Sequence, residues 1–466
     1  MSPRTTPAAP TNPALNLAAS AAANPAAALA PYDGPWTEAH AGHLLRRALG
    51  GASRVEVAAA AERTPAAALD ALFVRDEATA ATEAGWAAVG ERLARGGERA
   101  PLAAWWLMKL VRDGRATGSR LALVLHDHFA CTWSKTADPL ALYEQHQLFV
   151  ERGGGPFGAL LGEVVRGPAM LRFLDGDRNR RGAPNENLAR EVLELFTLGV
   201  GHYTEADIRE AARALTGWTV RDGRFAAVRA HHDPRPKLVL GTPVEDGSDV
   251  CRVAAGQPRC ARFLVAKFWS AYVSPTPPPG VVELLAERWR AQELDVAWLL
   301  RALLGSRAFH EPAARRSLVK SPVEFVVGAL RACGGTLDLV EAERACADMG
   351  QQLFEPPGVQ GWAGGEAWIH AAAWMARLRF ARRLATGLDD ATVDGLFDGG
   401  GGLLARLFDD EAGDDATRAL ELVGLAELGP ARADALRAAV PSGTSGRARR
   451  RDLLHAALAL PEAHLS

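Results

Sequence analysis

The feature that most constrains the fold is the stretch NENLAREVLELFTLGVGHYTEADIREAARALTGW, residues 185–218. On a helix that advances about 100° per residue, its apolar side chains fill one face and its polar side chains form a stripe on the other. The stripe consists of Glu186, Asn187, Arg190, Glu191 and Glu194. Two glycines then end the helix, and Thr204 caps a second helix with Asp207 as the acidic partner of the cap. The stretch therefore predicts a hairpin of two amphipathic helices.

The polar stripe places Glu191 and Glu194 one turn apart, where two carboxylates repel each other. A positive charge is therefore expected beside them. Ion pairs of surface strength, under about 1 kcal/mol each, would supply it. The candidate partners for such pairs are Arg190, Arg209 and Arg213. A cation bound by Asn187, Glu191 and Glu194 would supply the charge equally well, and the spacing leaves both explanations open.

The remaining chain is also dominated by helical patterns. Of its 466 residues 48% are hydrophobic and only 7% aromatic, which is typical of a globular protein rich in alanine and leucine. Apolar residues recur at helical spacing from Trp36 onward, between turns marked by glycine and proline. The only strong β signal is the alternating segment around Asp222-Gly223. We expect a mainly α protein, a multi-helical single body over residues 36–466 with one small β-hairpin.

Residues 1–35 consist largely of Ala, Pro, Asn and Ser and lack the uninterrupted apolar run of a secretory signal. This composition predicts a disordered leader and a cytoplasmic protein. No run of about 18 apolar residues occurs, so no transmembrane segment is expected. The formal net charge of −2 gives no basic surplus, which argues against nucleic acid as a partner.

Two residue types are informative because of how often they occur. The five cysteines are an odd number without a C-x-x-C pair, which excludes a complete disulfide framework and a zinc knuckle but leaves open whether Cys251 and Cys260 pair. Five of the 53 basic residues are lysine, so 48 are arginine. With such a bias an individual arginine carries little information, and the rare lysines are better candidates for chemistry. They are Lys109, Lys135, Lys237, Lys267 and Lys320.

A second polar cluster, His126-Asp127-His128, interrupts the apolar helix predicted for SRLALVLHDHFACTWSK. The two histidines stand about 200° apart on a regular helix, so they cannot bind one metal ion together unless the helix breaks. One histidine can then face a site while the other packs in the core. Three polar groups in one turn all need partners, and the pattern leaves a structural and a functional role equally open.

Two further segments carry candidate residues. His232, Asp233 and Lys237 cluster in the ribbon after Trp218, and Trp362 lies in a loop rich in glycine and proline, where its ring either floors a ligand pocket or seals the core. Burying so many charges at scattered places would be costly. We therefore expect the HDHF helix, the helix hairpin and the ribbon to meet around one cleft.

The motifs HLLRRALGG, HDHF, NENLARE, ELFTLG, HHDPRPKLVLG, CARFLVAKFW, VKSPVEF and MGQQLFEPPGVQGW occur in an order that resembles the bacterial family named domain of unknown function 1800, over roughly residues 40–465. The resemblance implies a predominantly helical body, a sulfatase-like companion protein as partner, and export as an alternative to a cytoplasmic location. It brings no established reaction. The chain departs from the family where Leu125 replaces a usual tryptophan and Gln257 a usual histidine. The matching positions are His126, His128, Asn185, Glu186, Asn187, Arg190, Glu191, Glu194, Trp218, His232, Asp233, Lys237, Gln351 and Trp362.

Two hypotheses of different classes follow. The first is a metal-assisted hydrolase that binds a divalent ion such as Zn, Mg or Ca. Its metal ligands would be His126 or His128 with Asn187, Glu191 and Glu194. Its catalytic groups would be Glu191, Glu194, Arg190, His128 and Lys237. Its substrate-binding groups would be Trp218, His232, Asp233, Gln351 and Trp362.

The second hypothesis is a non-catalytic helical scaffold that binds a companion protein. In this case the polar stripe is a structural network, with Glu186 paired to Arg190, and Glu191 or Glu194 paired to Arg209 or Arg213. The absence of a strong nucleophile, phosphate-loop or redox motif from the sequence favours this alternative. The sequence does not decide between the two hypotheses.

Overall fold

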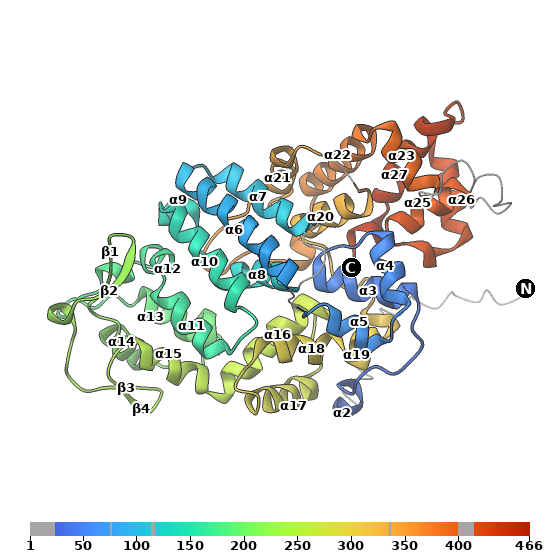
Figure 1. Cartoon of the computed structure of the whole chain (residues 1–466). Coiled ribbons are helices and arrows are strands. Elements are labelled where there is room, and N and C mark those ends of the chain that lie inside the picture. Colours follow the sequence, from blue (N-terminus) through green and yellow to red (C-terminus); the bar gives the residue numbers. More distant parts are fainter. Residues whose placement is uncertain (1–23, 75–76, 113–116, 335–336, 399–413) are drawn as a thin grey trace, which may run out of the picture.

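The computed structural model describes residues 24–74, 77–112, 117–334, 337–398 and 414–466. These residues form many helices and two small two-stranded antiparallel sheets (Figure 1). The mainly α fold predicted from the sequence is confirmed. No helix in the described ranges combines the length and the apolar run that a membrane crossing requires.

The described chain is helical from its start to Phe173. Its helices there are α2 (Pro25–Ala28), α3 (Glu38–Leu49), α4 (Arg54–Ala61), α5 (Pro65–Ala71), α6 (Glu77–Gly96), α7 (Arg99–Arg112), α8 (Thr117–His128), α9 (Trp133–Thr136), α10 (Pro139–Arg152), α11 (Phe157–Arg166) and α12 (Pro168–Phe173). Residues 24–35 were expected to be disordered, but Leu29 is buried in the core and the Tyr32 N–H donates to the Gly305 carbonyl. Residues 1–23 of the predicted leader lie outside the described residues.

The central part contains the predicted helix hairpin and both sheets. Its elements are η1 (Gly176–Arg178), α13 (Asn187–Leu193), the π-helical η2 (Glu194–Leu198), α14 (Glu205–Ala214), β1 (Trp218–Arg221), β2 (Arg224–Ala227), η3 (Arg229–His231), β3 (Lys237–Val239) and β4 (Thr242–Val244). Thr204 and Asp207 form the capping box that the sequence predicts at the start of α14. The hairpin predicted around Asp222-Gly223 is also present, as β1 paired with β2.

A second hairpin, β3 paired with β4, was not expected. Its turn consists of Leu240 and Gly241, whose φ angles of 50° and 73° both lie in the left-handed region. Leucine rarely adopts this conformation, so the turn has no strong sequence signal. The Leu240 N–H donates to the Asp207 carboxylate at 2.7 Å, and this tertiary contact helps to hold the turn.

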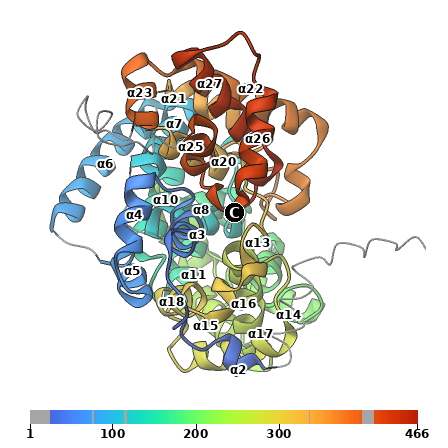
Figure 2. The ribbon, with the colours of Figure 1, turned by 90° about the vertical axis from the view of Figure 1, so that its right-hand side faces the viewer.

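The remaining chain is again helical. Its elements are α15 (Gly247–Gly256), α16 (Pro258–Tyr272), α17 (Pro279–Arg290), α18 (Val296–Leu304), α19 (Arg307–His310), η4 (Pro312–Ala314), α20 (Pro322–Ala332), α21 (Leu339–Asp348), η5 (Gly365–Trp368), α22 (Ala371–Gly387), α23 (Asp390–Asp398), α25 (Asp415–Leu422), η6 (Ala426–Leu428), α26 (Pro430–Ala439), α27 (Gly446–Leu458) and η7 (Pro461–His464). Figure 2 shows α22, α23 and α25–α27 at one end of the molecule, α14–α18 at the other, and α3 and α8 between them.

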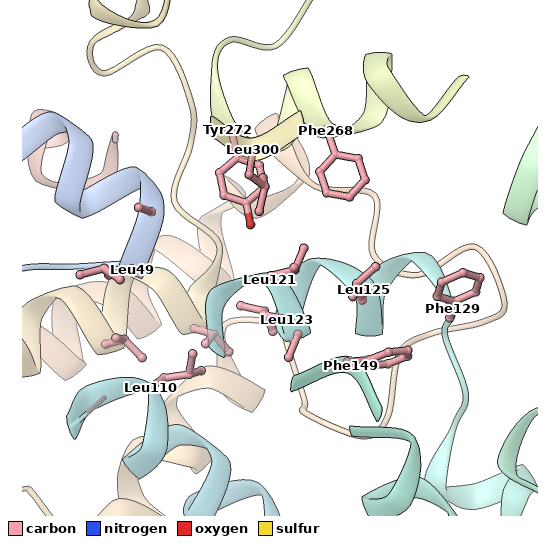
Figure 3. Packing of buried hydrophobic residues seen from close by; sticks show 14 of the residues in the cluster. Leu49, Leu110, Leu121, Leu123, Leu125, Phe129, Phe149, Phe268, Tyr272 and Leu300 are labelled. Carbon is pink, nitrogen blue, oxygen red and sulfur yellow. The ribbon is translucent and has the colours of Figure 1, made fainter. Parts of the chain in front are cut away.

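Helix α8 lies in the middle of the core. Leu121 and Leu125 point toward Phe268 and Tyr272 of α16, whereas Leu123 points away from them (Figure 3). A helix that is apolar on all sides must be covered on all sides, and α3, α7 and α10 pack against it. Burial of each leucine contributes about 1.5–3 kcal/mol. The position of α8 fixes where its last, polar turn lies.

All five cysteines are buried and free. Cys251 and Cys260, whose pairing the sequence left open, therefore do not form a disulfide. Burial raises the pKa of Cys251 to about 12, so its thiol stays protonated and unreactive at neutral pH.

We predict that Gly51→Ala lowers the free energy of unfolding by about 2 kcal/mol, because a Cβ at Gly51 would lie 2.5 Å from the Cα of Gly328 in α20. Gly85→Ala is the matched control. Gly85 is exposed within α6 with no atom within 4 Å of an added Cβ, so this change raises stability by about 0.5–1 kcal/mol. Urea unfolding of both variants measures the two changes. Equal changes would contradict the close packing of Gly51 on α20.

Candidate functional site at the end of helix α8

The first residue of the polar turn, His126, is a core residue. It is 3% exposed, and its ring packs against Trp106, Phe354 and Trp362 at centroid distances of 5.1–5.7 Å. Burial lowers the pKa of His126 to about 3, so the ring is neutral. Its Nε2 accepts a hydrogen bond from the Phe354 N–H at 3.3 Å. His126 therefore fastens the loop after α21 onto α8.

The second residue, Asp127, is half-buried and holds the same loop farther along. Its Oδ1 accepts a hydrogen bond from the Trp362 N–H at 2.8 Å. Gly361 has a φ of 74°, and a Cβ there would lie 2.3 Å from Oδ1, so only glycine allows this approach. Burial raises the pKa of Asp127, although the Lys267 ammonium opposes the shift. Oδ2 accepts no hydrogen bond from any described residue.

The third residue, His128, connects α8 to two other elements. Its Nε2 lies 3.2 Å from the Phe196 carbonyl, and its Nδ1 lies 3.0 Å from Nζ of Lys267 in α16. A carbonyl only accepts, so Nε2 carries the proton and Nδ1 accepts from the lysine. Burial and the nearby Lys267 charge hold the pKa of His128 well below its usual value, which agrees with a neutral ring.

Lys267 is half-buried, and burial lowers the pKa of its amine while the Asp127 charge opposes the shift. Its side chain is oriented by the hydrogen bond to His128 and lies 5.7 Å from the Phe263 ring centre. Asp127 and Lys267 are thus an acid and a base that both have perturbed pKa values and lie close enough to influence each other. Such pairs are concentrated at functional sites.

The π-helical turn η2 borders this site. The Gly199 N–H donates to the Glu194 carbonyl five residues earlier, at 2.8 Å, and the Thr197 hydroxyl donates to the Val192 carbonyl at 2.6 Å. Arg259 of α16 donates to the Leu198 carbonyl at 2.8 Å. The widened turn presents the Phe196 carbonyl to His128, and single π-helical turns inside helices often occur at functional sites.

The polar stripe on α13 makes different contacts from those predicted. The expected pair between Glu186 and Arg190 is confirmed at 3.2 Å. Of the partners that the sequence left open for Glu194, Arg190 is not used, because the arginine reaches Glu205 of α14 at 3.0 Å. Glu194 instead accepts the Tyr203 hydroxyl. Glu191 has no hydrogen bond or ion pair with any described residue, and burial together with the Glu194 charge raises its pKa.

The expected pairing of Arg213 with Glu191 or Glu194 is also wrong. Arg213 donates to Asp233 at 2.8 Å and to Glu210 at 2.6 Å. Asp233 is fully buried and also accepts from Arg235 at 2.6 Å, so the two guanidinium groups hold its pKa well below the usual range. A buried carboxylate in the ribbon competes better for Arg213 than the half-exposed acids of α13.

The other ribbon residues are held by the backbone around them. Nζ of Lys237 is buried and donates to the carbonyls of Asp233 at 2.7 Å and Arg235 at 3.1 Å, and burial lowers its pKa. Nδ1 of His232 lies 2.9 Å from the Thr216 carbonyl and therefore donates to it. These groups are used within the chain, and their contacts fix the ribbon on α14.

Three residues predicted to bind substrate make contacts with different elements. Trp218 is 4% exposed and packs against Phe225. Gln351 is 4% exposed, and its Oε1 accepts the Val323 N–H at 2.9 Å in the first turn of α20. Only Trp362 lies beside Asp127, and its ring is half-buried. The packing of Trp218 and the capping bond of Gln351 account for these two residues structurally.

The predicted metal ligands do not come together. His126 and His128 point to opposite sides of α8, as the helical geometry requires. Among the described residues, no three His, Cys, Asp or Glu side chains are grouped so that they could hold a metal ion. In the described part of the chain, no hydrogen bond or ion pair links His128 or Glu191 to Lys237. The polar residues of α8, of α13 and of the ribbon make separate sets of contacts. These contacts give no support to the predicted single cleft.

Asp127 and Lys267 lie at the candidate site but were not among the site residues predicted from the sequence. A signal for each was present, because Asp127 lies between two candidate histidines and Lys267 is one of only five lysines. Their proximity has no sequence signal, since 139 residues separate His128 from Lys267. Only the packing of α16 beside α8 and η2 brings them together.

We predict that Asp233→Asn lowers the free energy of unfolding at pH 7 by about 3 kcal/mol, because Arg213 loses its buried carboxylate partner. The folded-state pKa of Asp233 is depressed, so its stabilisation is complete above about pH 4 and is lost as the pH falls through the folded-state pKa. Denaturant unfolding at pH 7 and pH 3 measures the difference. An equal difference at both pH values would contradict the ion-pair explanation.

We predict that Glu191→Gln leaves stability at pH 7 unchanged or raises it by less than about 1 kcal/mol, because the carboxylate has no partner among the described residues. The folded-state pKa is raised, so the destabilisation by the charge begins as the pH rises above the unfolded-state value of about 4.3 and is complete above the folded-state pKa. The difference therefore disappears below about pH 4. Melting curves at both pH values test this. A loss above about 2 kcal/mol would instead indicate a structural ion pair.

The comparisons with known proteins agree with the resemblance found in the sequence. The model of the family described as "Protein of unknown function (DUF1800)" matches residues 43–465. No curated protein and no solved structure matches the chain. The matched range includes the polar turn of α8, the helix hairpin and Lys267. The chain therefore belongs to the DUF1800 family.

Proposed function

We propose that the protein is an acid–base enzyme, a hydrolase in which Lys267 and Asp127 transfer protons. The observation that carries this proposal is the hydrogen bond of 3.0 Å between Nζ of Lys267 and Nδ1 of His128, next to a half-buried carboxyl group. Lysine has an ordinary pKa of about 10.4, and a base acts best when its pKa lies near the working pH. Burial moves the Lys267 amine in that direction.

His128 acts as a positioning residue in this proposal. Its Nε2–H is occupied by the Phe196 carbonyl, so its Nδ1 can only accept. A neutral Lys267 amine can donate one N–H to Nδ1 and still direct its lone pair away from the histidine. That lone pair is then available to remove a proton from a water molecule that attacks the substrate.

Asp127 supplies the second proton-transfer group. Its Oδ1 is held by the Trp362 N–H, and its Oδ2 is left without a partner among the described residues. Burial favours the protonated carboxyl, which can donate to a leaving group, as a general acid does. The Trp362 ring packs against His126 and is half-buried, and its open side offers a flat apolar surface to the substrate. The proposal uses no metal ion, because the predicted ligands are not grouped.

The alternative of a scaffold that binds a companion protein is supported by a different observation. Arg190 pairs with Glu205 across the helix hairpin, and Arg213 pairs with Asp233 of the ribbon, so these contacts make the hairpin and the ribbon a fixed surface. The alternative needs no reactive lysine. The titration behaviour of Lys267 therefore distinguishes the two functions.

Competitive labelling of the lysines with a trace of acetic anhydride, followed across pH by mass spectrometry, tests the acid–base proposal. The chain has only five lysines, so each can be quantified separately. We predict that Lys267 titrates below the ordinary lysine value. Asp127→Asn shifts its midpoint further down over the pH range in which Asp127 is ionised in the wild type, because the carboxylate charge raises the pKa of Lys267. Lys135→Met, which changes an exposed lysine paired with Asp175, leaves the midpoint unchanged.

A Lys267 that titrates at about 10.4 in the folded protein would overturn the acid–base function and leave the scaffold alternative. On any chromogenic ester that the wild-type protein hydrolyses, Lys267→Met is expected to reduce kcat by about 100-fold or more, and Lys135→Met to leave it unchanged.

A further inference from the structure

The protein has a cavity of about 410 Å³ that is separate from the acid–base site. Neither Lys267 nor Asp127 lines this cavity. Its walls come from α3 and α4 on one side and from α20, α25, η6 and α27 on the other. The exposed residues Thr37 and Glu38 also line it, so it is open to solvent. None of the residues that form the hydrogen bonds of the acid–base site lines this cavity.

The cavity contains a guanidinium group without a partner. Arg46 makes no hydrogen bond or ion pair with any described residue. A Cβ added to Gly42 would lie 2.8 Å from Nη1 of Arg46, and a Cβ added to Gly424 would lie 2.5 Å from the same atom. The lack of a side chain at these two glycines therefore leaves room for the guanidinium group. Burial lowers the pKa of Arg46 to about 10, and the side chain remains charged at neutral pH. A partly buried charge of this kind is costly unless an anion accompanies it.

A second cation, Lys320, lines the same cavity. Its Nζ donates to the Ala463 carbonyl at 2.7 Å, and no carboxylate forms an ion pair with it among the described residues. Burial, followed by the charge of Arg46, lowers the pKa of Lys320 to about 7. Arg377 and Arg316 act in the same direction, whereas Glu324 opposes them.

Within the described residues, the acidic residues of the cavity form no ion pair with these two cations, although the Glu427 charge opposes the lowering of the Arg46 pKa. Glu421 pairs with Arg418 at 3.0 Å and with Arg54 at 3.5 Å, and Glu427 pairs with Arg316. Glu38 is exposed in the first turn of α3, where the helix dipole already favours a carboxylate. Arg46 and Lys320 therefore remain as positive groups that face an open space.

The other walls are apolar. They are formed by Ala52, Val57, Phe325, Ala329, Ala332, Leu422 and Leu458. At about 30 Å³ for each water-sized group, the volume holds roughly a dozen non-hydrogen atoms. A planar guanidinium matches the two oxygens of a carboxylate. We propose that this cavity binds an amphipathic monocarboxylate, whose head group lies on Arg46 and Lys320 and whose apolar body lies against α20 and α27.

Isothermal titration calorimetry of the full chain with decanoate, at pH 8 and in two buffers of different ionisation enthalpy, tests the proposal. We expect one decanoate per chain and uptake of up to one proton, because the carboxylate favours the charged form of Lys320. Decan-1-ol and decylamine are expected to bind at least tenfold more weakly. The proton uptake disappears in Lys320→Met.

Arg46→Gln is expected to weaken decanoate binding at least tenfold, whereas Arg54→Gln, which changes an exposed arginine already paired with Glu421, weakens it less than threefold. Ala332→Phe fills the cavity without changing a charge, so it abolishes binding and decides the question if Arg46→Gln does not fold. The absence of saturable binding to the wild-type chain overturns the proposal. Equal binding by wild type and Ala332→Phe overturns it as well.

Discussion

The last turn of helix α8 is the place on which the surrounding structure depends. Three successive polar residues there hold four different partners: His126 holds the Phe354 N–H, Asp127 holds the Trp362 N–H, and His128 holds both the Phe196 carbonyl and Lys267. Because the rest of α8 is buried on all sides, these groups can neither turn toward solvent nor exchange partners without loss of core packing. Segments more than 60 residues apart are thereby fixed relative to one another.

The charged groups of the protein are of two kinds. Some pair within the chain and stabilise the fold, and others have no partner within the described residues and can contact a ligand. Asp233, Arg213 and Arg190 are paired within the chain, and loss of the buried pair between Arg213 and Asp233 is expected to cost stability. Oδ2 of Asp127 and the guanidinium of Arg46 have no partner among the described residues. A buried polar group without a partner is costly. The proposed ligand sites therefore rest on the unpaired groups and not on the most numerous charges.

The sequence predicted local structure more accurately than it predicted contacts between side chains. The helix hairpin, its capping box and the β1–β2 turn follow from patterns within about ten residues, and they are all present. Arg213 was expected beside Glu191 or Glu194 but pairs with Glu210 and the buried Asp233, because several carboxylates lie within its reach and burial decides among them. The β3–β4 hairpin was missed because its Leu240-Gly241 turn depends on a contact with Asp207.

The sequence by itself determined the fold class, the family and the opposite directions of His126 and His128, because these depend on helical periodicity and on local order along the chain. Only the tertiary structure decided that Lys267 lies on His128, that Glu191 has no partner, and that Arg46 faces a cavity beside Lys320. The physical reason is that pKa values and pairing depend on distance and burial in space. The spacing of residues along the chain determines neither the distance between two groups nor their burial.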